Sequence, residues 1–340
     1  MAKFQPGNWE IVRPLKEGGQ CWTYLVKRKN SDDDVEYVLK RLKNPERIGR
    51  FATEIEATTK LSHSGIVRIV DFCLKSDSPF LVTEYCHGGS LADCKPYWRS
   101  DPVAALAIIE QILESVHFAH CNGVLHGDLK PDNIFLKSAK GPPVVGDFGL
   151  SLLLDSDTRH TDTLEAVGPR LYMAPELENG RIDNVTEASD IYSLGKVLYW
   201  LLAGRVFSRE AHRERQWDIK QFFQDPFSAE GDSSLEHVNF ILDRMLDINP
   251  SERFDGSNLL ILIRQAQALI RQKYHSLTLA VRHHCTFCGR GSYKLHIDNN
   301  PQKAREMGLT STAASSWRMM LCNQCGHVQL FNFLGGEGWK

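Results

Sequence analysis

Short apolar runs separated by turn residues fill the first quarter of the chain. The runs are rich in β-branched and aromatic residues, and polar clusters such as Asn30 to Asp34 lie between them, which is typical of strands joined by turns. In one segment the apolar side chains instead recur every three to four residues, which places them on one face of a helix. The pattern predicts strands at 24–27, 35–42, 66–74 and 80–85, with a helix at 46–61.

After Gly89 the apolar residues follow a helical period. Asp101 and Pro102 supply an N-cap and a proline at the first helical position, and Gly123 stands where a left-handed residue commonly ends a helix. Three further helices are expected downstream, so that the four lie at 101–123, 187–203, 235–246 and 257–273. We therefore expect a small lobe rich in strands (about 9–86) followed by a helical large lobe (about 87–273).

Composition and charge suggest a second module. The hydrophobic fraction of 42% and the charged fraction of 24% are ordinary for a folded protein. No apolar run reaches membrane-spanning length and none at the start resembles a signal peptide, so we expect a cytoplasmic protein with no membrane partner. From Arg271 onward, nine Lys and Arg face three Asp and Glu, a balance of about +6 in a chain whose formal charge is −2. The rest of the chain is therefore acidic.

Side chains suited to phosphoryl transfer gather after the first large-lobe helix. The stretch from His126 to Asn133 reads HGDLKPDN, and Asp147 opens an Asp-Phe-Gly sequence fourteen residues later. Transfer from ATP needs a carboxylate that orients and deprotonates the incoming hydroxyl, oxygen ligands for Mg²⁺, and a cation near the phosphates. The sequence offers Asp128 as the base, Asn133 and Asp147 as Mg²⁺ ligands, and Lys130 beside the base.

With these motifs in this order, the chain resembles the protein kinase family from about Trp9 to Lys273. The resemblance implies an α+β, two-lobed protein kinase fold, with an antiparallel β small lobe and a helical large lobe within 1–273. It also implies ATP and Mg²⁺ as cofactors and a protein as substrate. Lys130 is the residue type that the family associates with Ser/Thr kinases rather than Tyr kinases.

Positions in the small lobe match the nucleotide site of the family. By this resemblance Lys40 contacts the α and β phosphates and Glu54 pairs with it, although Glu56 competes for that role. Glu84 and Cys86 resemble the hinge whose backbone bonds adenine. The resemblance thus implies that the nucleotide lies between the two lobes.

Positions in the large lobe match the structural anchors of the family. Met173 to Glu176 resembles the end of the activation segment, and Arg253 resembles the usual partner of Glu176. Asp190 resembles the buried aspartate that braces the catalytic loop.

Three departures from the family pattern bear on function. The phosphate-covering loop keeps Gly18 of its three usual glycines, with Gly19 adding flexibility, and both are candidate nucleotide-binding residues. Gly127 replaces the Arg that often binds an activation-segment phosphate, so switching by such a phosphate should be weak. Pro169 stands where a Thr would contact the catalytic Asp. An alternative function therefore stays open, a pseudokinase or nucleotide-binding scaffold that acts through the C-terminal module.

Four of the nine cysteines form two CxxC pairs near the C-terminus. Cys285 and Cys288 make the first pair and Cys322 and Cys325 the second, with 33 residues between the pairs. Each pair is followed by Gly, which resembles a zinc knuckle, and two knuckles supply a tetrahedral Cys₄ site for Zn²⁺. The alternative, two redox dithiols, lacks the βαβ context that usually surrounds them.

We expect a zinc-ribbon-like module at 274–340. As a structural staple, the metal would allow a stretch too small for a robust core to fold. The basic balance and the aromatic residues of this module leave nucleic-acid binding as a second role, which we favour less because ribbon aromatics more often belong to the core.

Overall fold

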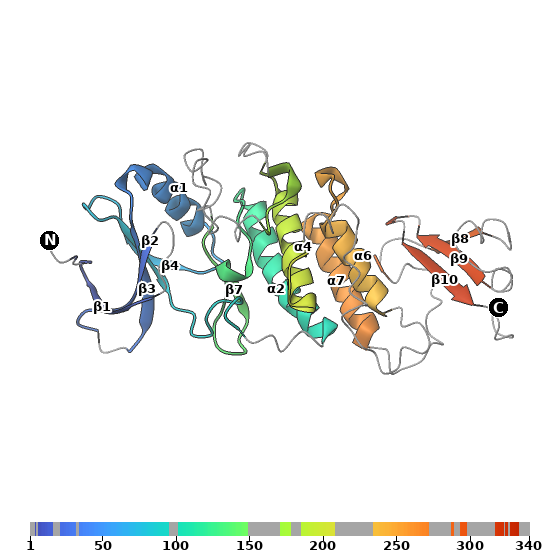
Figure 1. Cartoon of the computed structure of the whole chain (residues 1–340), viewed down its shortest axis with the longest axis horizontal. Coiled ribbons are helices and arrows are strands. Elements are labelled where there is room, and N and C mark those ends of the chain that lie inside the picture. Colours follow the sequence, from blue (N-terminus) through green and yellow to red (C-terminus); the bar gives the residue numbers. More distant parts are fainter. Residues whose placement is uncertain are drawn as a thin grey trace. The chain divides into compact units, whose positions relative to one another are not determined.

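A computed structural model gives the structure of the chain (Figure 1). It describes residues 4, 6–15, 21–31, 34–94, 101–148, 171–177, 185–207, 234–271, 287–288, 293–297, 317–322, 324–325 and 327–332. The chain divides into two compact units, Met1–Leu260 and Ile261–Lys340. This division falls within a helix, and the expected boundary at 273 stays a prediction.

The first unit opens with a five-stranded sheet in the order β1-β2-β3-β5-β4 (Figure 1). Every neighbouring pair is antiparallel. The strands are β1 (Trp9–Pro14), β2 (Cys21–Arg28), β3 (Glu36–Leu42), β4 (Ile69–Cys73) and β5 (Phe80–Glu84). The four predicted strands are confirmed as β2 to β5, and β1 adds an edge strand that ends at a proline, a residue tolerated at sheet edges.

Side chains cover both faces of this sheet. Helix α1 (Ile48–Thr59) packs Phe51 and Ile55 on one face, against Leu42 and Leu81. The opposite face carries a second apolar cluster, formed by Trp9, Val26, Leu39, Phe80 and Val82. Because neighbouring residues of a strand face opposite sides, Leu39 in this cluster leaves Lys40 on the α1 side.

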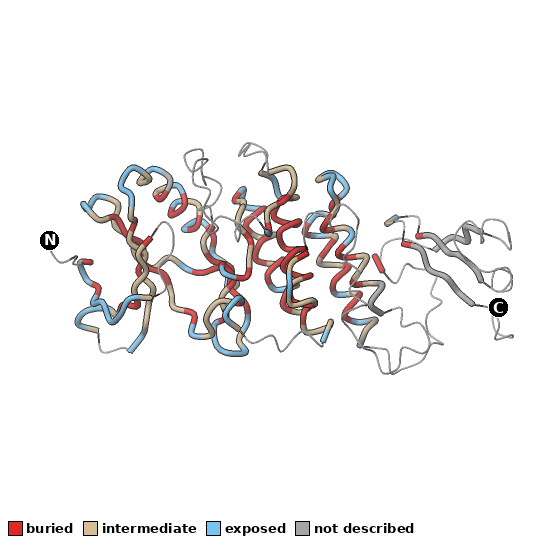
Figure 2. The backbone as a smooth tube through the Cα atoms, in the orientation of Figure 1, coloured by how far each residue is buried: buried red, intermediate tan, exposed pale blue. Residues whose placement is uncertain are grey.

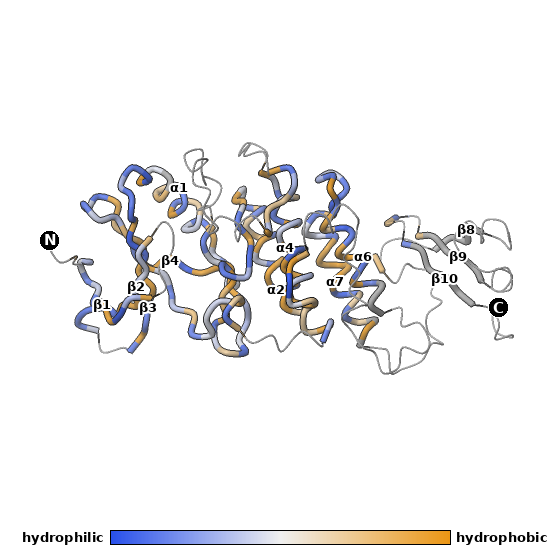
Figure 3. Tube along the Cα trace, viewed as in Figure 1, coloured by the Kyte–Doolittle hydropathy of each residue, from blue (hydrophilic) through white to orange (hydrophobic). Residues whose placement is uncertain are grey.

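Helix α2 (Pro102–Cys121) forms the centre of the large lobe. The Asp101 side chain accepts hydrogen bonds from the N–H groups of Val103 and Ala104, and Gly123 has a φ of 72°, so both predicted ends are confirmed. Figures 2 and 3 show that much of α2 is buried and apolar. Among the described residues it is the one helix long and apolar enough to cross a membrane, and a buried core helix passes the same test.

The described part of the large lobe contains three more α-helices, each within two residues of the predicted bounds. They are α4 (Glu187–Ala203), α6 (Ser234–Met245) and α7 (Gly256–Arg271). A Cβ atom added at Gly195 of α4 would lie 2.8 Å from the Cβ of Met245, so this glycine permits the close approach of α4 and α6. Gly204 ends α4 in a left-handed conformation with a φ of 70°.

A short two-stranded sheet was missing from the sequence-based expectations. Strands β6 (Ile134–Leu136) and β7 (Pro143–Val145) pair antiparallel. They span three residues each, which is too short for an alternating pattern to show. Their place matters, because β6 follows Asn133 and β7 leads to Asp147.

The second unit contains a three-stranded antiparallel sheet in the order β10-β9-β8. The strands are β8 (Tyr293–Ile297), β9 (Trp317–Cys322) and β10 (Val328–Asn332). Cys322 ends β9, and Cys325 lies in the turn before β10. The second CxxC pair therefore spans the tight connection between two paired strands.

Candidate active site and cysteine cluster

Asp190 of α4 holds the backbone of the loop 126–133, which carries Asp128 and is called the catalytic loop below. Its carboxylate accepts hydrogen bonds from the N–H groups of His126 (2.8 Å) and Gly127 (2.7 Å), and from Nε2 of His120 on α2 (2.8 Å). Burial by itself would raise the pKa of Asp190, but the hydrogen bonds that its carboxylate accepts from His120 and from the His126 N–H help to outweigh burial and lower that pKa. Asp190 therefore stays ionised and braces the loop, as expected.

His126 connects the loop to the segment that carries Asp147. Its Nδ1 accepts the N–H of Asp128 at 3.1 Å, which leaves Nε2 to donate to the carbonyl oxygen of Gly146 at 2.9 Å. The imidazole is fully buried, and its ring centroid lies 4.7 Å from that of Phe148. One side chain thus ties Asp128 to the residue before Asp147.

Asp128 is held by two of the predicted site residues. Its Oδ2 accepts hydrogen bonds from Lys130 Nζ (2.5 Å) and from Asn133 Nδ2 (2.9 Å). Asn133 Nδ2 also donates to the carbonyl oxygen of Asp128 at 2.8 Å. The base, its neighbouring cation and one predicted Mg²⁺ ligand therefore lie together in one loop.

Gly127 adopts a backbone conformation that suits glycine. Its φ is 75°, in the left-handed region where a Cβ atom is strained. The residue that replaces the usual Arg therefore lets the loop direct its N–H to Asp190 without backbone strain.

Lys40 and Asp147 form an ion pair across 107 positions of the chain. Lys40 lies in the middle of β3 and Asp147 follows β7, with a φ of 60° that is unusual for a residue with a side chain. Burial alone would lower the pKa of Lys40, but the neighbouring charge of Asp147 and the hydrogen bond to it raise that pKa overall. The amine is therefore charged and lies in the site where the sequence predicted it.

Glu54 faces the same site, although its expected ion pair is absent from this structure. Its side chain is only 4% exposed and its Oε2 has no hydrogen-bond partner among the described residues. Lys40 pairs with Asp147 instead, so the structure differs from the expectation at this contact. The competing residue, Glu56, is exposed and pairs with Lys60, so Glu54 is the glutamate of α1 that faces the interior.

The pKa of Glu54 follows from its surroundings. Burial raises it well above the ordinary value, the negative charge of Asp147 raises it further, and Lys40 lowers it by less. The raised pKa disfavours the charged form of Glu54, in keeping with the ion pair that Lys40 forms with Asp147.

The predicted hinge follows β5. Glu84 joins β5 to the loop before β4, because its N–H donates to the carbonyl oxygen of Arg68 (3.2 Å) and its Oε1 accepts the N–H of Arg68 (3.1 Å). The Cys86 carbonyl oxygen accepts the N–H of Gly89 at 3.1 Å. These bonds fix the backbone on both sides of the segment expected to contact adenine.

Two thiols near this site are poor nucleophiles. Burial raises the pKa of Cys21 to about 12 and that of Cys86 to about 11, and nearby carboxylates contribute to both shifts. Both residues behave as small buried hydrophobes.

Segment Leu171–Leu177 is anchored at its end by the expected ion pair. Glu176 accepts hydrogen bonds from Arg253 Nη1 (2.7 Å) and Nη2 (2.9 Å), and Ser189 Oγ donates to it at 3.0 Å. Burial would raise the pKa of Glu176, but these hydrogen bonds and the Arg253 charge lower it. The bidentate geometry gives this pair its strength and direction.

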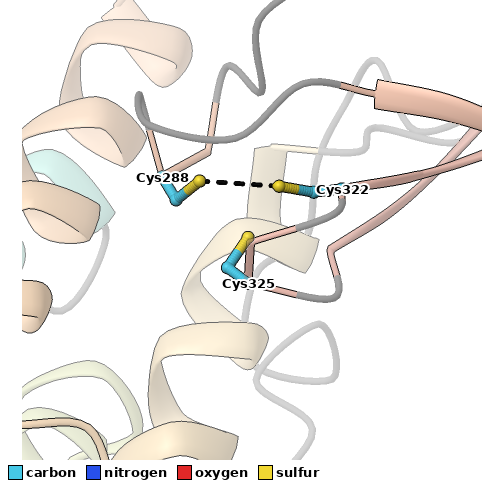
Figure 4. Close-up of side chains that lie close together, drawn as sticks. All are labelled: Cys288, Cys322 and Cys325. Atoms are coloured by element: carbon cyan, nitrogen blue, oxygen red, sulfur yellow. Dashed lines mark hydrogen bonds between the residues drawn. The ribbon is translucent and has the colours of Figure 1, made fainter.

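Three of the predicted cysteines lie together in the second unit (Figure 4). The sulfur atoms of Cys288, Cys322 and Cys325 all lie within 4.8 Å of one another, and Cys288 Sγ is 3.6 Å from Cys322 Sγ. Cys288 and Cys322 are buried. Close to them, the ring of His327 stacks on Phe287 with centroids 4.6 Å apart.

Several predicted positions lie outside the described residues. They are Gly18 and Gly19 of the phosphate-covering loop, Pro169, and Cys285 of the first CxxC pair. Their roles stay predictions.

The residues brought together fit ATP and Mg²⁺. Asp147 and Asn133 offer hard carboxylate and amide oxygens, which Mg²⁺ prefers. Glu54 Oε2 is buried and has no hydrogen-bond partner among the described residues, so it would be available as an acceptor for Lys40 if Asp147 held the metal ion. The donor set therefore matches the chemistry of a phosphoryl-transfer site.

Comparison with known proteins agrees with this geometry. The family model of the protein kinase domain matches residues 9–270. The chain therefore belongs to the protein kinase family.

Three bacterial Ser/Thr kinases are similar to the chain. Serine/threonine-protein kinase Pkn1 of Myxococcus xanthus is 34% identical over 265 residues, which cover 73% of this chain and 36% of that protein. PrkC of Bacillus subtilis is 35% identical over 207 residues (59% and 31%), and PknB of Mycobacterium leprae is 31% identical over 205 residues (58% and 32%). The match thus spans about a third of the length of these relatives.

Two functional contacts were not predicted. His120 is buried on α2 among apolar residues and donates to Asp190. Lys196 lies among the apolar residues of α4, only 4% exposed, and no expectation had been attached to it. Both contacts could have been suspected from the sequence, because each involves a polar residue at a helical position whose spacing predicts burial.

Proposed function

We propose that the first unit is an ATP-dependent Ser/Thr protein kinase, which transfers the γ-phosphoryl group of ATP to a Ser or Thr hydroxyl of a protein. The observation that carries the proposal is the arrangement of Asp128. Its carboxylate is held by Lys130 and Asn133, in a loop that His126 ties to the Lys40–Asp147 pair. The similarity to Ser/Thr kinases supports the choice of substrate class.

Each side chain has a defined task in this mechanism. Asp128 orients the substrate hydroxyl and accepts its proton, while Lys130 lies beside the Asp128 carboxylate and offers positive charge to the transferring group. Lys40 holds the nucleotide phosphates, and Asn133 and Asp147 would hold Mg²⁺. The metal ion, when bound, supplies charge neutralisation of the phosphates. Asp190 and His126 keep this geometry fixed before the substrate arrives.

Labelled ATP tests the proposal. The native chain with Mg²⁺ is expected to label itself or myelin basic protein on Ser and Thr, and Asp128→Asn should lower the rate by about 10²- to 10⁴-fold, the usual contribution of a positioned base. Asp77→Asn, which changes an exposed carboxylate in a loop, is the matched control and should retain the native rate.

The same preparation separates this proposal from the alternative of a nucleotide-binding scaffold. ATP and Mg²⁺ should raise the melting temperature of both the native chain and Asp128→Asn, because the base makes no contribution to nucleotide binding in this mechanism. Thermal stabilisation by ATP without any transfer by the native chain would favour the scaffold. Equal labelling by the native chain and Asp128→Asn would contradict the assignment of the base.

We further propose that the second unit binds Zn²⁺ through Cys288, Cys322, Cys325 and Cys285. The mutual approach of three sulfur atoms supports this, because thiolates at such distances can share one metal ion and soft sulfur ligands suit Zn²⁺. This proposal includes the zinc-ribbon-like character of 274–340. A cytoplasmic location, which keeps thiols reduced, belongs to the same proposal.

Metal analysis tests the zinc site. Protein purified without chelator is expected to contain about one Zn²⁺ per chain, since four Cys complete one tetrahedral site. Cys322→Ser should lose most of this zinc, whereas Cys121→Ser, which changes an exposed cysteine in α2, should retain it. Native protein with substoichiometric metal would contradict the proposal.

A further inference from the structure

Segment Leu171–Leu177 lies beside the catalytic loop. Tyr172 and Ala174 are buried, and the charge of Asp132, which is in the loop, contributes to the raised pKa of Tyr172 after burial itself. The Leu171 side chain remains 42% exposed, so one side of this segment is open to a binding partner. On the proposed kinase function, we assign this open side to the protein substrate.

Lys196 holds the beginning of this segment. Its Nζ donates to the carbonyl oxygen of Leu171 at 2.8 Å and to that of Phe207 at 3.4 Å. The same ammonium lies 4.3 Å from the centroid of the Phe207 ring, a distance at which a cation is attracted to the ring face. A lysine that is 4% exposed thus directs its charge at the backbone of Leu171.

Arg253 holds the other end, through the bidentate contact with Glu176 described above. Its guanidinium also lies 4.9 Å from the centroid of the Tyr192 ring, and Lys196 Nζ lies 5.9 Å from that centroid on the same helix. Both cations therefore contact one aromatic residue of α4 and anchor the two ends of one segment.

The two anchors differ in what they bind. Arg253 binds a side chain, so it fixes position 176, whereas Lys196 binds a main-chain carbonyl and fixes the direction of the backbone at 171. The Lys196–Leu171 hydrogen bond is partly buried, and its charged donor makes it stronger than a neutral hydrogen bond. The exposed face of Leu171 is then presented in one orientation.

We propose that Lys196 is a positioning residue for the protein substrate, which holds the Leu171 end of segment 171–177 against α4. The role rests on the proposed kinase function, because it assigns the held surface to the substrate of that reaction. It predicts that Lys196 affects the use of protein substrate and leaves the binding of ATP unchanged.

Hydrogen exchange tests the hold on the segment without any substrate. In Lys196→Met, which keeps the length of the side chain and removes its donors, amides of 171–177 are expected to exchange about tenfold faster, the effect of losing one charge-assisted hydrogen bond. The amides of His126 and Gly127 should be unchanged, because Asp190 accepts their hydrogen bonds. Lys60→Met, an exposed lysine on α1, is the matched control and should match the native chain throughout.

Steady-state kinetics with myelin basic protein test the role in catalysis. Lys196→Met should raise KM for this protein about tenfold, with KM for ATP within about twofold of the native value, and Lys196→Arg should restore part of the loss because it keeps charge and donors. If Lys196→Met does not melt cooperatively, Lys196→Gln, which keeps a donor but no charge, serves in its place with the same expected direction.

The outcomes separate this inference from the proposed function. Unchanged exchange at 171–177 in a folded variant would overturn the inference, as would an increase spread evenly over α2 and α4, which indicates general loosening. If the native chain transfers no phosphate at all, the kinase proposal fails, and the assignment of Lys196 to a protein substrate fails with it. Faster exchange at 171–177 would then still show that Lys196 holds the segment.

Discussion

At the scale of single residues, Glu54 is the least satisfied group of the candidate site. A carboxyl that is 4% exposed, with one oxygen lacking a hydrogen bond, keeps its proton to a higher pH than a carboxyl in water. Between the unfolded pKa and the raised folded pKa, the native state binds a proton that the unfolded chain has released. The stability that this proton contributes is therefore lost as the pH rises through that window.

Glu54→Gln should reveal this effect. Gln imitates the protonated carboxyl without its titration, so at pH 8 and without nucleotide the variant should melt a few degrees above the native chain. At pH 5 the difference should become smaller, because the unfolded chain then also binds this proton for part of the time. Melting followed by circular dichroism at both pH values measures it.

The matched control is Glu56→Gln, on the exposed side of the same helix. It should change the melting temperature little, because exposed ion pairs contribute at most about 1 kcal/mol. In the kinase assay, Glu54→Gln should lose about tenfold in rate, since the variant has no carboxylate to pair with Lys40 when nucleotide is bound. A melting temperature of Glu54→Gln that lies below the native one by the same amount at both pH values would contradict this account.

The sequence located the chemical groups but not all of their contacts. Asp128, Lys130 and Asn133 are close in sequence, so their grouping in one loop could be expected, and the hydrogen bonds among them are of that local kind. The partner of Lys40 was harder to foresee. Two carboxyl groups, those of Glu54 and Asp147, lie near the same amine, and the sequence does not indicate which of them it pairs with.

At the scale of elements, the ends of a helix can be predicted from the sequence when the residues that fix them lie close by in the chain. Helix α2 was bounded correctly because Asp101, Pro102 and Gly123 act on backbone groups within one turn of themselves. Helix α4 ends at Gly204 for the same reason. Neither prediction needs knowledge of the rest of the fold.

Strands β6 and β7 show the opposite case. Each has three residues, and their pairing is supported by surroundings that come from elsewhere in the chain. The Val67 N–H, for example, donates to the Val145 carbonyl oxygen at 2.9 Å, and the Val145 N–H donates to the Gly65 carbonyl oxygen at 2.8 Å. Tertiary contacts stabilise such strands, and a pattern of three residues is too short to predict them.

Lys196 and His120 were missed for a related reason. Each occupies a helical position whose spacing predicts burial. The sequence does not show which group a buried polar side chain at such a position would bind. The partners, the Leu171 carbonyl and Asp190, come from separate segments. The packing of α4 against α2 brings His120 to Asp190, and the packing of segment 171–177 against α4 brings the Leu171 carbonyl to Lys196.

At the scale of the whole molecule, the described interiors of the two units differ. The first unit has buried apolar clusters on both faces of its sheet and a helical core around α2 and α4. Beyond α7, the described part of the second unit contains three short strands and three clustered sulfur atoms. A small stretch of this kind commonly depends on metal binding for its folding free energy.

Removal of the metal should therefore affect one unit and spare the other. With a strong zinc chelator, limited proteolysis is expected to cleave beyond residue 271 rapidly, while the first unit remains resistant and keeps its ATP-dependent thermal shift. Cys322→Ser should show the same cleavage without chelator, because it lacks one of the thiolates. Added Zn²⁺ should restore resistance in the treated native chain and not in Cys322→Ser. Equal protease resistance with and without chelator, in protein shown to have lost its zinc, would mean that the strands of the second unit fold without the metal.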